Sequence, residues 1–307
     1  MNSTRLFLLL LLILPIGPAK ADARLELQKV SGQVYAIVGE LSNRSPENLG
    51  NNATFGFVVT DNGVVLIDPG GSYRGAEAIA NIIKQVSAQP VVRVINTGGQ
   101  DHRWLGNGYF RERGASIIAS SKAVTDQQTR ARDQLIGLTN LVGEAGLKGT
   151  DPVYADQRFT DSFEFTLGAT RFEIHHSGEA HTPGDSYVWL PQQRVMFSGD
   201  IVYVERMLSI GAQSSSKGWI DVFEAMAAYQ PEHLVPGHGR ATTLEHARKD
   251  TLDYLLFLRA AVGDFMDDGG DISDIGSIDQ SAYHYLRNHE NLAGRNAQKV
   301  FTELEWE

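Results

Sequence analysis

Residues 181–200 read HTPGDSYVWLPQQRVMFSGD, an apolar hairpin pattern with a polar turn at each end. In the first turn, Pro183 and Gly184 closely follow His181 and would hold its imidazole on a rigid support. In the second turn, Asp200 follows an apolar strand, where a carboxylate is costly unless it is paired or bound to a metal. Downstream, residues 234–239 read LVPGHG and place His238 at another strand end. We therefore expect these three side chains to meet at one rim of a sheet.

Outward from this stretch, short apolar runs alternate with helical patterns. The two halves of the chain each begin with strands and continue with amphipathic segments. Expected strands cover residues 33–38, 54–60, 63–68, 91–96, 115–119, 163–167, 170–175, 186–190, 194–197 and 233–235. Expected helices cover residues 73–86, 103–113, 219–229 and 252–262.

Two strand-rich halves with helices on their outer sides predict an α/β fold of stacked sheets, an αββα sandwich. We expect a domain over residues 22–242 and a helical C-terminal extension over residues 243–307, packed against it. No repeat with a solenoid period is present.

The N-terminus is typical of an export signal. Arg5 precedes an apolar run over residues 6–16, and Ala19-Lys20-Ala21 supplies a cleavage pattern. We expect a signal peptide over residues 1–21 and a periplasmic or secreted protein. A cut after Ala23 and an uncleaved anchor are the alternatives, although about 11 apolar residues are too few to span a bilayer.

Composition excludes several functions. The chain contains no cysteine, so it has no thiolate ligand, no disulfide and no lipid-anchoring cysteine. Removal of the leader would leave 25 basic and 37 acidic side chains, a net charge of −12. An acidic protein without basic clusters is a poor partner for nucleic acid or for anionic lipid. We expect a small-molecule substrate and no membrane contact after cleavage; the oligomeric state stays open.

Together, His181, Asp200 and His238 supply the imidazole and carboxylate ligands that suit zinc. Each also has a simpler interpretation on its own. A loop histidine often caps nearby backbone, an aspartate at a turn often caps a helix or forms a salt bridge, and a lone Gly-His-Gly is weak evidence.

The order HTPGD, FSGD and PGHG resembles the second half of the motif set of the metallo-β-lactamase superfamily. The opening hairpin TFGFVV…GVVLIDPG is also similar to the first hairpin of that family, in which Asp68 would have a structural role. The resemblance covers roughly residues 27–242 and implies the αββα fold with zinc-dependent hydrolysis. Within the family, the overall likeness is to exported SoxH-like and quinoprotein-relay zinc hydrolases.

The first family motif, His-x-His-x-Asp-His, is degenerate in this chain, where residues 98–103 read GGQDHR. An ungapped alignment puts Gly98 and Gln100 at the two histidine positions, His102 at the aspartate position and Arg103 at the last histidine. A one-residue shift instead matches Asp101 and His102 to the Asp-His pair. In both registers the paired histidines of the first metal are absent.

In the shifted register, the resemblance implies a nearly complete second metal site of Asp101, His102, Asp200 and His238. His181 would add a ligand or a supporting donor, so we expect one zinc ion rather than two. The alternative for Asp101-His102 is a helix cap, in which the carboxylate accepts backbone N–H bonds.

The expected reaction is attack of zinc-bound hydroxide on a thioester, ester or lactam-type carbonyl. Asp101 would orient the nucleophile or carry its proton, Gln100 would stabilise the oxyanion, and Arg206 could contact substrate. The rival hypothesis is a non-catalytic family member that binds a ligand or a partner protein in the former cleft. Loss of the first histidines favours this rival, and retention of the later motifs opposes it.

Overall fold

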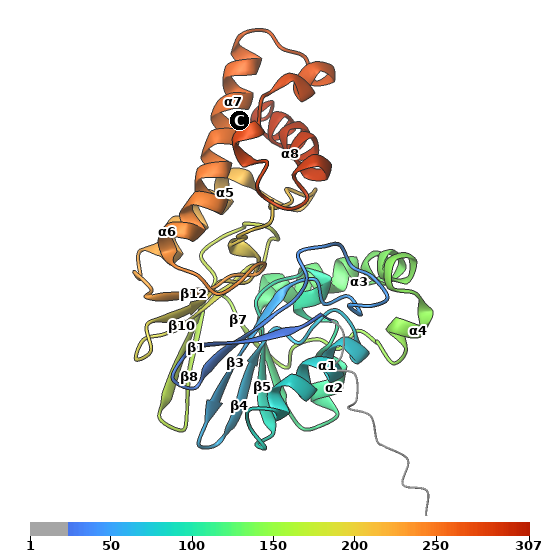
Figure 1. Ribbon diagram of the computed structural model, residues 1–307, viewed down its shortest axis with the longest axis vertical. Helices are drawn as coiled ribbons and strands as arrows, with labels where there is room; N and C mark the ends of the chain where they lie inside the picture. The colour runs from blue at the N-terminus through green and yellow to red at the C-terminus, as the bar shows by residue number, and fades with distance from the viewer. Residues whose placement is uncertain (1–23) are drawn as a thin grey trace, which may run out of the picture.

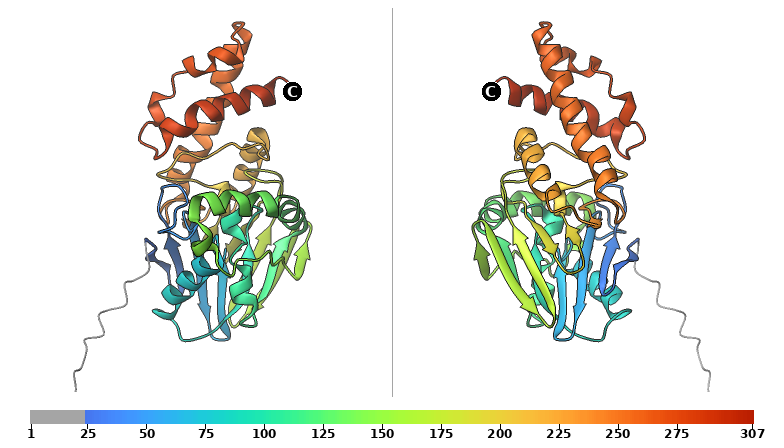
Figure 2. Two further views of the ribbon diagram at one scale, coloured as in Figure 1. Left: turned by 90° about the vertical axis from the view of Figure 1, so that its right-hand side faces the viewer. Right: turned by 90° about the vertical axis from the view of Figure 1, so that its left-hand side faces the viewer.

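A computed structural model describes residues 24–307 of the chain. The expected signal peptide lies outside the described residues, so that expectation stays a prediction. Between Arg24 and Glu307, no helix combines the length and the apolar character needed to cross a membrane. Two β-sheets lie face to face with helices on their outer sides, and a helical extension stands at one end (Figures 1 and 2). The expected α/β sandwich with C-terminal helices is confirmed.

The first sheet has seven strands that lie in chain order. The first four strands pair antiparallel and the last four pair parallel, so its character changes at β4. The strands are β1 (Glu26–Ser31), β2 (Val34–Val38), β3 (Thr54–Thr60), β4 (Gly63–Ile67), β5 (Val91–Asn96), β6 (Ser116–Ser120) and β7 (Gln157–Phe159).

The second sheet has five strands in the order β12-β11-β10-β9-β8. Its strands are β8 (Ser162–Leu167), β9 (Thr170–His175), β10 (Tyr187–Leu190), β11 (Val195–Phe197) and β12 (His233–Val235). Because β11 and β12 run parallel with Phe197 opposite Val235, both strands end at the same edge. The turns that carry Asp200 and His238 therefore start side by side.

The space between the sheets is filled by branched aliphatic and aromatic side chains. Phe172, Ile174 and Phe197 of the second sheet pack there against the inner face of the first. Gly56 on β3 is required for this packing, because a Cβ at that position would lie 2.2 Å from the ring of Phe197. This shared core fixes the distance between the two sheet edges that carry the polar turns.

Helices cover the outer faces. Those over the first sheet are α1 (Tyr73–Lys84), α2 (Asn107–Arg111), α3 (Ser121–Val142) and the short α4 (Glu144–Leu147). The second sheet is covered by α5 (Ser216–Ala227), whose Trp219 and Phe223 are buried beneath it. Two 3-10 turns, η1 (Asp101–Arg103) and η2 (Gly199–Ile201), lie at the strand ends.

The C-terminal extension begins with α6 (Leu244–Ala247) and runs through a π-helical turn (Arg248–Leu252) into α7 (Asp253–Asp267). Two 3-10 turns (Ile272–Ser277 and Ser281–Tyr283) lead to α8 (His289–Leu304). The extension shares its hydrophobic core with α5 and the second sheet. In Figure 1 the extension projects from one end of the sandwich, and the loop after β2 lies at that same end. The expected domain boundary near residue 242 stays a prediction.

Candidate functional site

Four chain turns meet at one edge of the sandwich. Asp68 follows β4, η1 follows β5 after a short loop, Asp200 lies in η2 after β11, and His238 follows β12. Asp68 takes a left-handed backbone conformation (φ 63°), and its carboxylate accepts hydrogen bonds from the backbone N–H and the hydroxyl of Thr97. Strand ends therefore bring these polar residues together, as the sequence predicts.

His102, Asp200 and His238 form the centre of the site. The Nε2 atom of His102 lies 3.1 Å from Asp200 Oδ2, and that of His238 lies 3.2 Å from Asp200 Oδ1. One atom from each of the three buried side chains lies within 4.8 Å of the others, close enough to hold a metal ion. Within residues 24–307 this is the one group of three such side chains. We call these three residues the histidine side of the site.

Arg103 anchors the histidine side from beneath. Its guanidinium donates to both oxygens of Asp200, at 3.1 and 2.7 Å, and to Asp68 Oδ2 at 2.9 Å. Its remaining donors reach the carbonyl oxygens of Thr54 and Gly237 at 3.0 and 2.8 Å. All five N–H groups therefore have an acceptor, although the side chain is fully buried. The two carboxylates raise the pKa of Arg103 despite its burial, so it carries a permanent positive charge.

The PGHG turn is shaped by this arginine. A Cβ at position 237 would lie 2.4 Å from the carbonyl oxygen of Gly199 and 2.6 Å from an Arg103 nitrogen. Only glycine at this position lets the turn pass close enough for its carbonyl to accept the Arg103 hydrogen bond.

Asp200 accepts four hydrogen bonds, two from Arg103 and one from each histidine. Burial acts to raise the pKa of Asp200, but the Arg103 charge and the histidine donors outweigh it and hold the pKa well below its usual range. The carboxylate is therefore ionised and hydrogen-bonded on all of its lone pairs.

Two further arginines face the other ring nitrogens. Arg44 lies 2.9 Å from Nδ1 of His102, and Arg206 lies 3.1 Å from Nδ1 of His238. A guanidinium only donates, so the contact of Arg206 favours the His238 tautomer in which Nε2 carries the proton and donates to Asp200; Nδ1 of His102 lies 3.1 Å from Asp101 Oδ1 as well. Burial and the Arg206 charge also lower the pKa of His238 well below its usual value, so that ring is neutral.

Formal charges cancel in this cluster. The carboxylates of Asp68, Asp101 and Asp200 face the guanidiniums of Arg44, Arg103 and Arg206. Burial raises the pKa of Asp68, while the Arg103 charge and the Thr97 hydrogen bonds act in the opposite direction. A dication would thus enter a balanced group rather than a carboxylate-rich one.

The donor set nevertheless fits zinc. Two imidazoles and one carboxylate are the ligands of a catalytic zinc site that keeps one position open. A zinc ion needs an unprotonated Nε2 on each ring, so its binding must release or move the protons that face Asp200.

The structure places the other predicted ligands outside the group of three. Asp101 turns toward Arg44, with which it forms an ion pair and a short hydrogen bond. Burial would raise the pKa of Asp101, but Arg44 and His102 hold it well below its usual range. His102 and Arg103 both face Asp200, and the register of the first motif stays a prediction. A ligand role for Asp101 stays a prediction.

His181 also stands apart. Its Nδ1 donates to the carbonyl oxygen of Ser209 at 3.1 Å, so Nε2 is the unprotonated nitrogen. The ring packs against Trp219 and Tyr203, with centroids 5.4 and 5.9 Å away. Burial lowers the pKa of His181 to about 4. It is a neutral imidazole near the histidine side, and its predicted ligand role stays untested.

The space next to the absent histidines is occupied. A Cβ at Gly98 would lie 2.5 Å from an oxygen of Asp185, and one at Gly99 would lie 1.8 Å from an oxygen of Asp126. Burial raises the pKa of Asp185 to about 8, against hydrogen bonds from Thr182. We call Gly98, Gly99 and these two carboxylates the glycine side of the site.

Gln100 lies at the edge, where its side-chain amide is 3.4 Å from Asp101 Oδ1. Arg206 is 7 % exposed and contacts His238, as described above. Arg44 was missed by the sequence analysis, since it lies in the long loop after β2 and no motif marks it. Arg103 was placed at a ligand position of the motif, but its ion pairs were not expected, because no sequence signal puts it beside two buried carboxylates.

Comparison with known proteins settles the family. The model of the metallo-β-lactamase superfamily matches residues 50–238, more than half of the chain. The chain belongs to this superfamily. The match spans every turn of the site from Asp68 to His238, which confirms the family resemblance seen in the sequence.

Superfamily relatives are distant. A type 2 metallo-β-lactamase of Bacteroides fragilis is 22 % identical over 262 residues, covering 81 % of this chain and 96 % of that protein. One from Elizabethkingia meningoseptica is 26 % identical over 149 residues, 48 % of this chain and 51 % of that one.

Solved structures of superfamily members share the fold. A metallo-β-lactamase from Pontibacter korlensis aligns with a TM-score of 0.60 and 22 % identity, covering 76 % of this chain and 99 % of that one. A double mutant of the sec-alkyl sulfatase PisA1 aligns with a TM-score of 0.69 and 16 % identity. That alignment covers 91 % of this chain and 50 % of the sulfatase. Superfamily members are hydrolytic, and this chain keeps a His-Asp-His group that could hold a metal.

Proposed function

We propose that this superfamily member is an exported hydrolase that uses one zinc ion held by His102, Asp200 and His238. The observation that carries the proposal is the convergence of these three buried side chains on one point. The substrate would contain a thioester, ester or lactam-type carbonyl, as the superfamily membership suggests.

When bound, zinc supplies Lewis acidity toward a carbonyl oxygen and toward water. The protein's own residues would do the rest. Asp200 is fixed in place by Arg103, and the two histidine rings are held from behind by Arg44 and Arg206. Such support keeps catalytic groups within a narrow range of positions.

His181 is the candidate for proton transfer. Its hydrogen bond to Ser209 leaves Nε2 unprotonated, and its low pKa keeps it neutral at physiological pH. Its free Nε2 can therefore take part in passing a proton on, although its lowered pKa makes it a weak base; Asp101, held ionised by Arg44, is a weak base too. Gln100 lies beside Asp101 and offers an amide donor for a developing oxyanion.

A second candidate function has one specific observation in its favour. Asp200 accepts four hydrogen bonds, Arg103 uses all five donors, and the formal charges around them cancel. A polar network that is complete without a cation suits a non-catalytic member that binds a ligand or a partner protein.

Zinc analysis of the purified mature protein separates the two. After reconstitution and removal of loose metal, we expect about one zinc per chain and turnover of a thioester, lactone or lactam. His238→Ala should abolish both, while His233→Ala should change neither, since His233 is exposed on β12, the strand that precedes His238. Zinc well below one equivalent in the unmodified protein would exclude the hydrolase and leave the binding role.

A further inference from the structure

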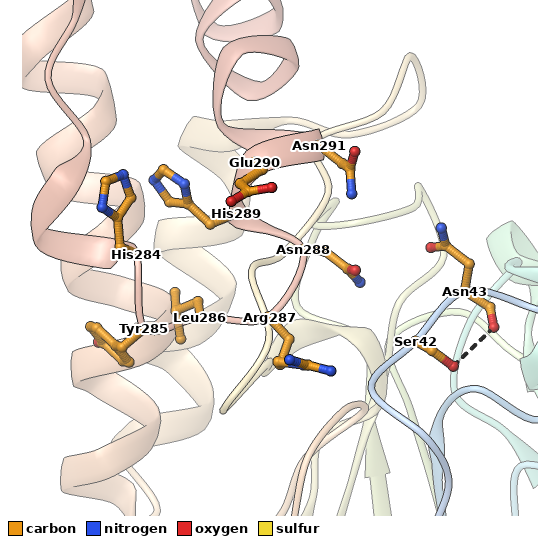
Figure 3. Close-up of a pocket in the computed structure, with 10 residues that line it drawn as sticks. All are labelled: Ser42, Asn43, His284, Tyr285, Leu286, Arg287, Asn288, His289, Glu290 and Asn291. Atoms are coloured by element: carbon orange, nitrogen blue, oxygen red, sulfur yellow. Dashed lines mark hydrogen bonds between the residues drawn. The ribbon is translucent and has the colours of Figure 1, made fainter.

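A cavity of about 660 Å³ lies between the loop after β2 and the C-terminal extension. Its walls are Ser42 and Asn43 on one side and residues 284–291 on the other (Figure 3). The volume falls within the range of small-molecule sites. In Figure 3 the side chain of Arg287 extends into the cavity, toward the wall that holds Ser42.

The wall formed by the extension is held in place by hydrogen bonds. The backbone of Arg287 donates to Glu205 and accepts from Met207, so it pairs directly opposite Arg206. The side-chain amide of Asn288 donates to the carbonyl of Leu41, which ties the two walls together. Directly opposed residues of paired segments project to the same face, so Arg206 and Arg287 leave the backbone side by side.

Arg206 is buried and Arg287 is exposed, and unlike Arg44 and Arg103 neither of them forms a direct ion pair within the described residues. No carboxylate of residues 24–307 lies within ion-pair distance of Arg206 or Arg287. Arg206 is 7 % exposed, and its buried Nε has no hydrogen-bond partner among the described residues. The same holds for Nε of Arg44. A buried N–H group without an acceptor is costly, so the unsatisfied Nε of Arg206 indicates a ligand that completes its hydrogen bonds.

Each wall of the cavity is connected through the backbone to an arginine that contacts the histidine side. Ser42 and Asn43 lead directly to Arg44, which contacts His102. On the other wall, Arg287 stands opposite Arg206, which contacts His238. A molecule with one end in the cavity would therefore extend toward the candidate metal ligands.

We propose that this cavity binds an anionic group, a carboxylate or a phosphate, at the end of the substrate remote from the reacting carbonyl. Arg287, which lines the cavity, supplies the recognition, because a planar guanidinium matches the paired oxygens of both anions; the buried Arg206 adds positive charge from the neighbouring segment. Glu290, the acidic residue of the lining, opposes this binding. The proposal rests on the proposed function only in identifying the ligand as a substrate; binding itself needs no turnover.

Calorimetry on the full mature protein, with and without zinc, tests the proposal with three probes: succinate, inorganic phosphate and uncharged succinamide. We expect an anion to bind in both forms and succinamide to bind in neither. The anion that binds more tightly identifies the natural group as a carboxylate or a phosphate.

Two substitutions in the cavity should change the affinity for an anion in opposite directions. Arg287→Gln should weaken anion binding at least tenfold, and Glu290→Gln should strengthen it. Arg132→Gln is the matched control, because Arg132 is exposed on α3 and does not line the cavity, and it should change nothing. Equal binding of succinate and succinamide, or equal binding by wild type and Arg287→Gln, would overturn the proposal.

Measurements of turnover distinguish a failure of the cavity proposal from a failure of the hydrolase proposal. On an ester that carries a carboxylate, Arg287→Gln should raise KM and leave kcat unchanged. Anion binding without hydrolysis would retain the cavity and reject the hydrolase. Hydrolysis of neutral esters, unaffected by Arg287→Gln and without anion binding, would retain the hydrolase and reject the cavity.

Discussion

The glycine side and the histidine side of the site lie next to each other but are built in opposite ways. On the glycine side, Asp126 and Asp185 fill the space that any side chain at Gly98 or Gly99 would need. On the histidine side, Arg103 holds Asp200 next to two imidazoles, and the three side chains could bind a metal ion. The comparison shows that no empty space is left where the first two histidines of the motif are absent. The fold has closed one half of the site and kept the other half organised.

The largest effect is expected at Arg103 on the histidine side. Arg103→Met leaves Asp68 and Asp200 buried without their cation and should lower the free energy of unfolding by about 3–5 kcal/mol. Chemical denaturation followed by circular dichroism measures the change, with Arg132→Gln as an exposed control. A loss below about 1 kcal/mol would show that the arginine does not anchor this side.

On the glycine side, Gly99→Ala should cost about 1–3 kcal/mol, because its Cβ would overlap an oxygen of Asp126. The same substitution at Gly137, which is in α3 with open space around its Cβ, should be neutral or stabilising by up to about 1 kcal/mol. Equal denaturation midpoints for the two variants would mean that the glycine side is not closely packed.

Asp185 makes the glycine side sensitive to pH. Its pKa of about 8 exceeds the usual value of a free aspartate, so the folded state holds one more proton than the unfolded state between about pH 4 and pH 8. Its contribution to stability is therefore present at low pH and is lost as pH rises, by up to about 1.4 kcal/mol per pH unit.

Asp185→Asn removes this titration. The stability of the variant relative to wild type should rise from pH 5 to pH 8, as measured by denaturation at several pH values. Asp133→Asn, an exposed change on α3, serves as the control. A difference that stays constant with pH would contradict the raised pKa.

The smallest effect is expected at Asp101, which lies beside the histidine side without joining it. Asp101→Asn weakens the pair with Arg44 and should cost about 1 kcal/mol, while zinc content should stay within twofold of wild type. His102→Ala should lose the metal. If Asp101→Asn loses zinc as well, the shifted register of the first motif is correct and Asp101 is a ligand.

Much of the fold could be predicted because its strands carry strong local signals. The strand β5 (Val91–Asn96) and the strand β12 (His233–Val235) have the predicted bounds. The expected helix over residues 103–113 is instead a 3-10 turn followed by the five-residue α2. A Cβ at Gly106 would lie 2.2 Å from the carbonyl oxygen of Pro69, a long-range closeness that periodicity in one segment does not report.

The site was predicted in part. Asp200 and His238 were marked by glycine-bounded turns after apolar strands, and the structure brings them together with His102. Arg44 was absent from the prediction, because an arginine in a long loop resembles any solvated cation. The ion pairs of Arg103 were also absent, because a guanidinium needs partners from three separate turns to be buried.

By itself, the sequence determined the family, the sandwich and the turns that carry the candidate ligands, since these depend on local patterns of apolar and turn residues. Only the tertiary structure decided which side chains face Asp200 and that Asp101 turns toward Arg44. It also decided that two carboxylates close the glycine side and that Arg287 of the extension stands opposite Arg206. The physical reason is that hydrogen bonds and ion pairs between distant segments depend on distances that the packing of two sheets sets.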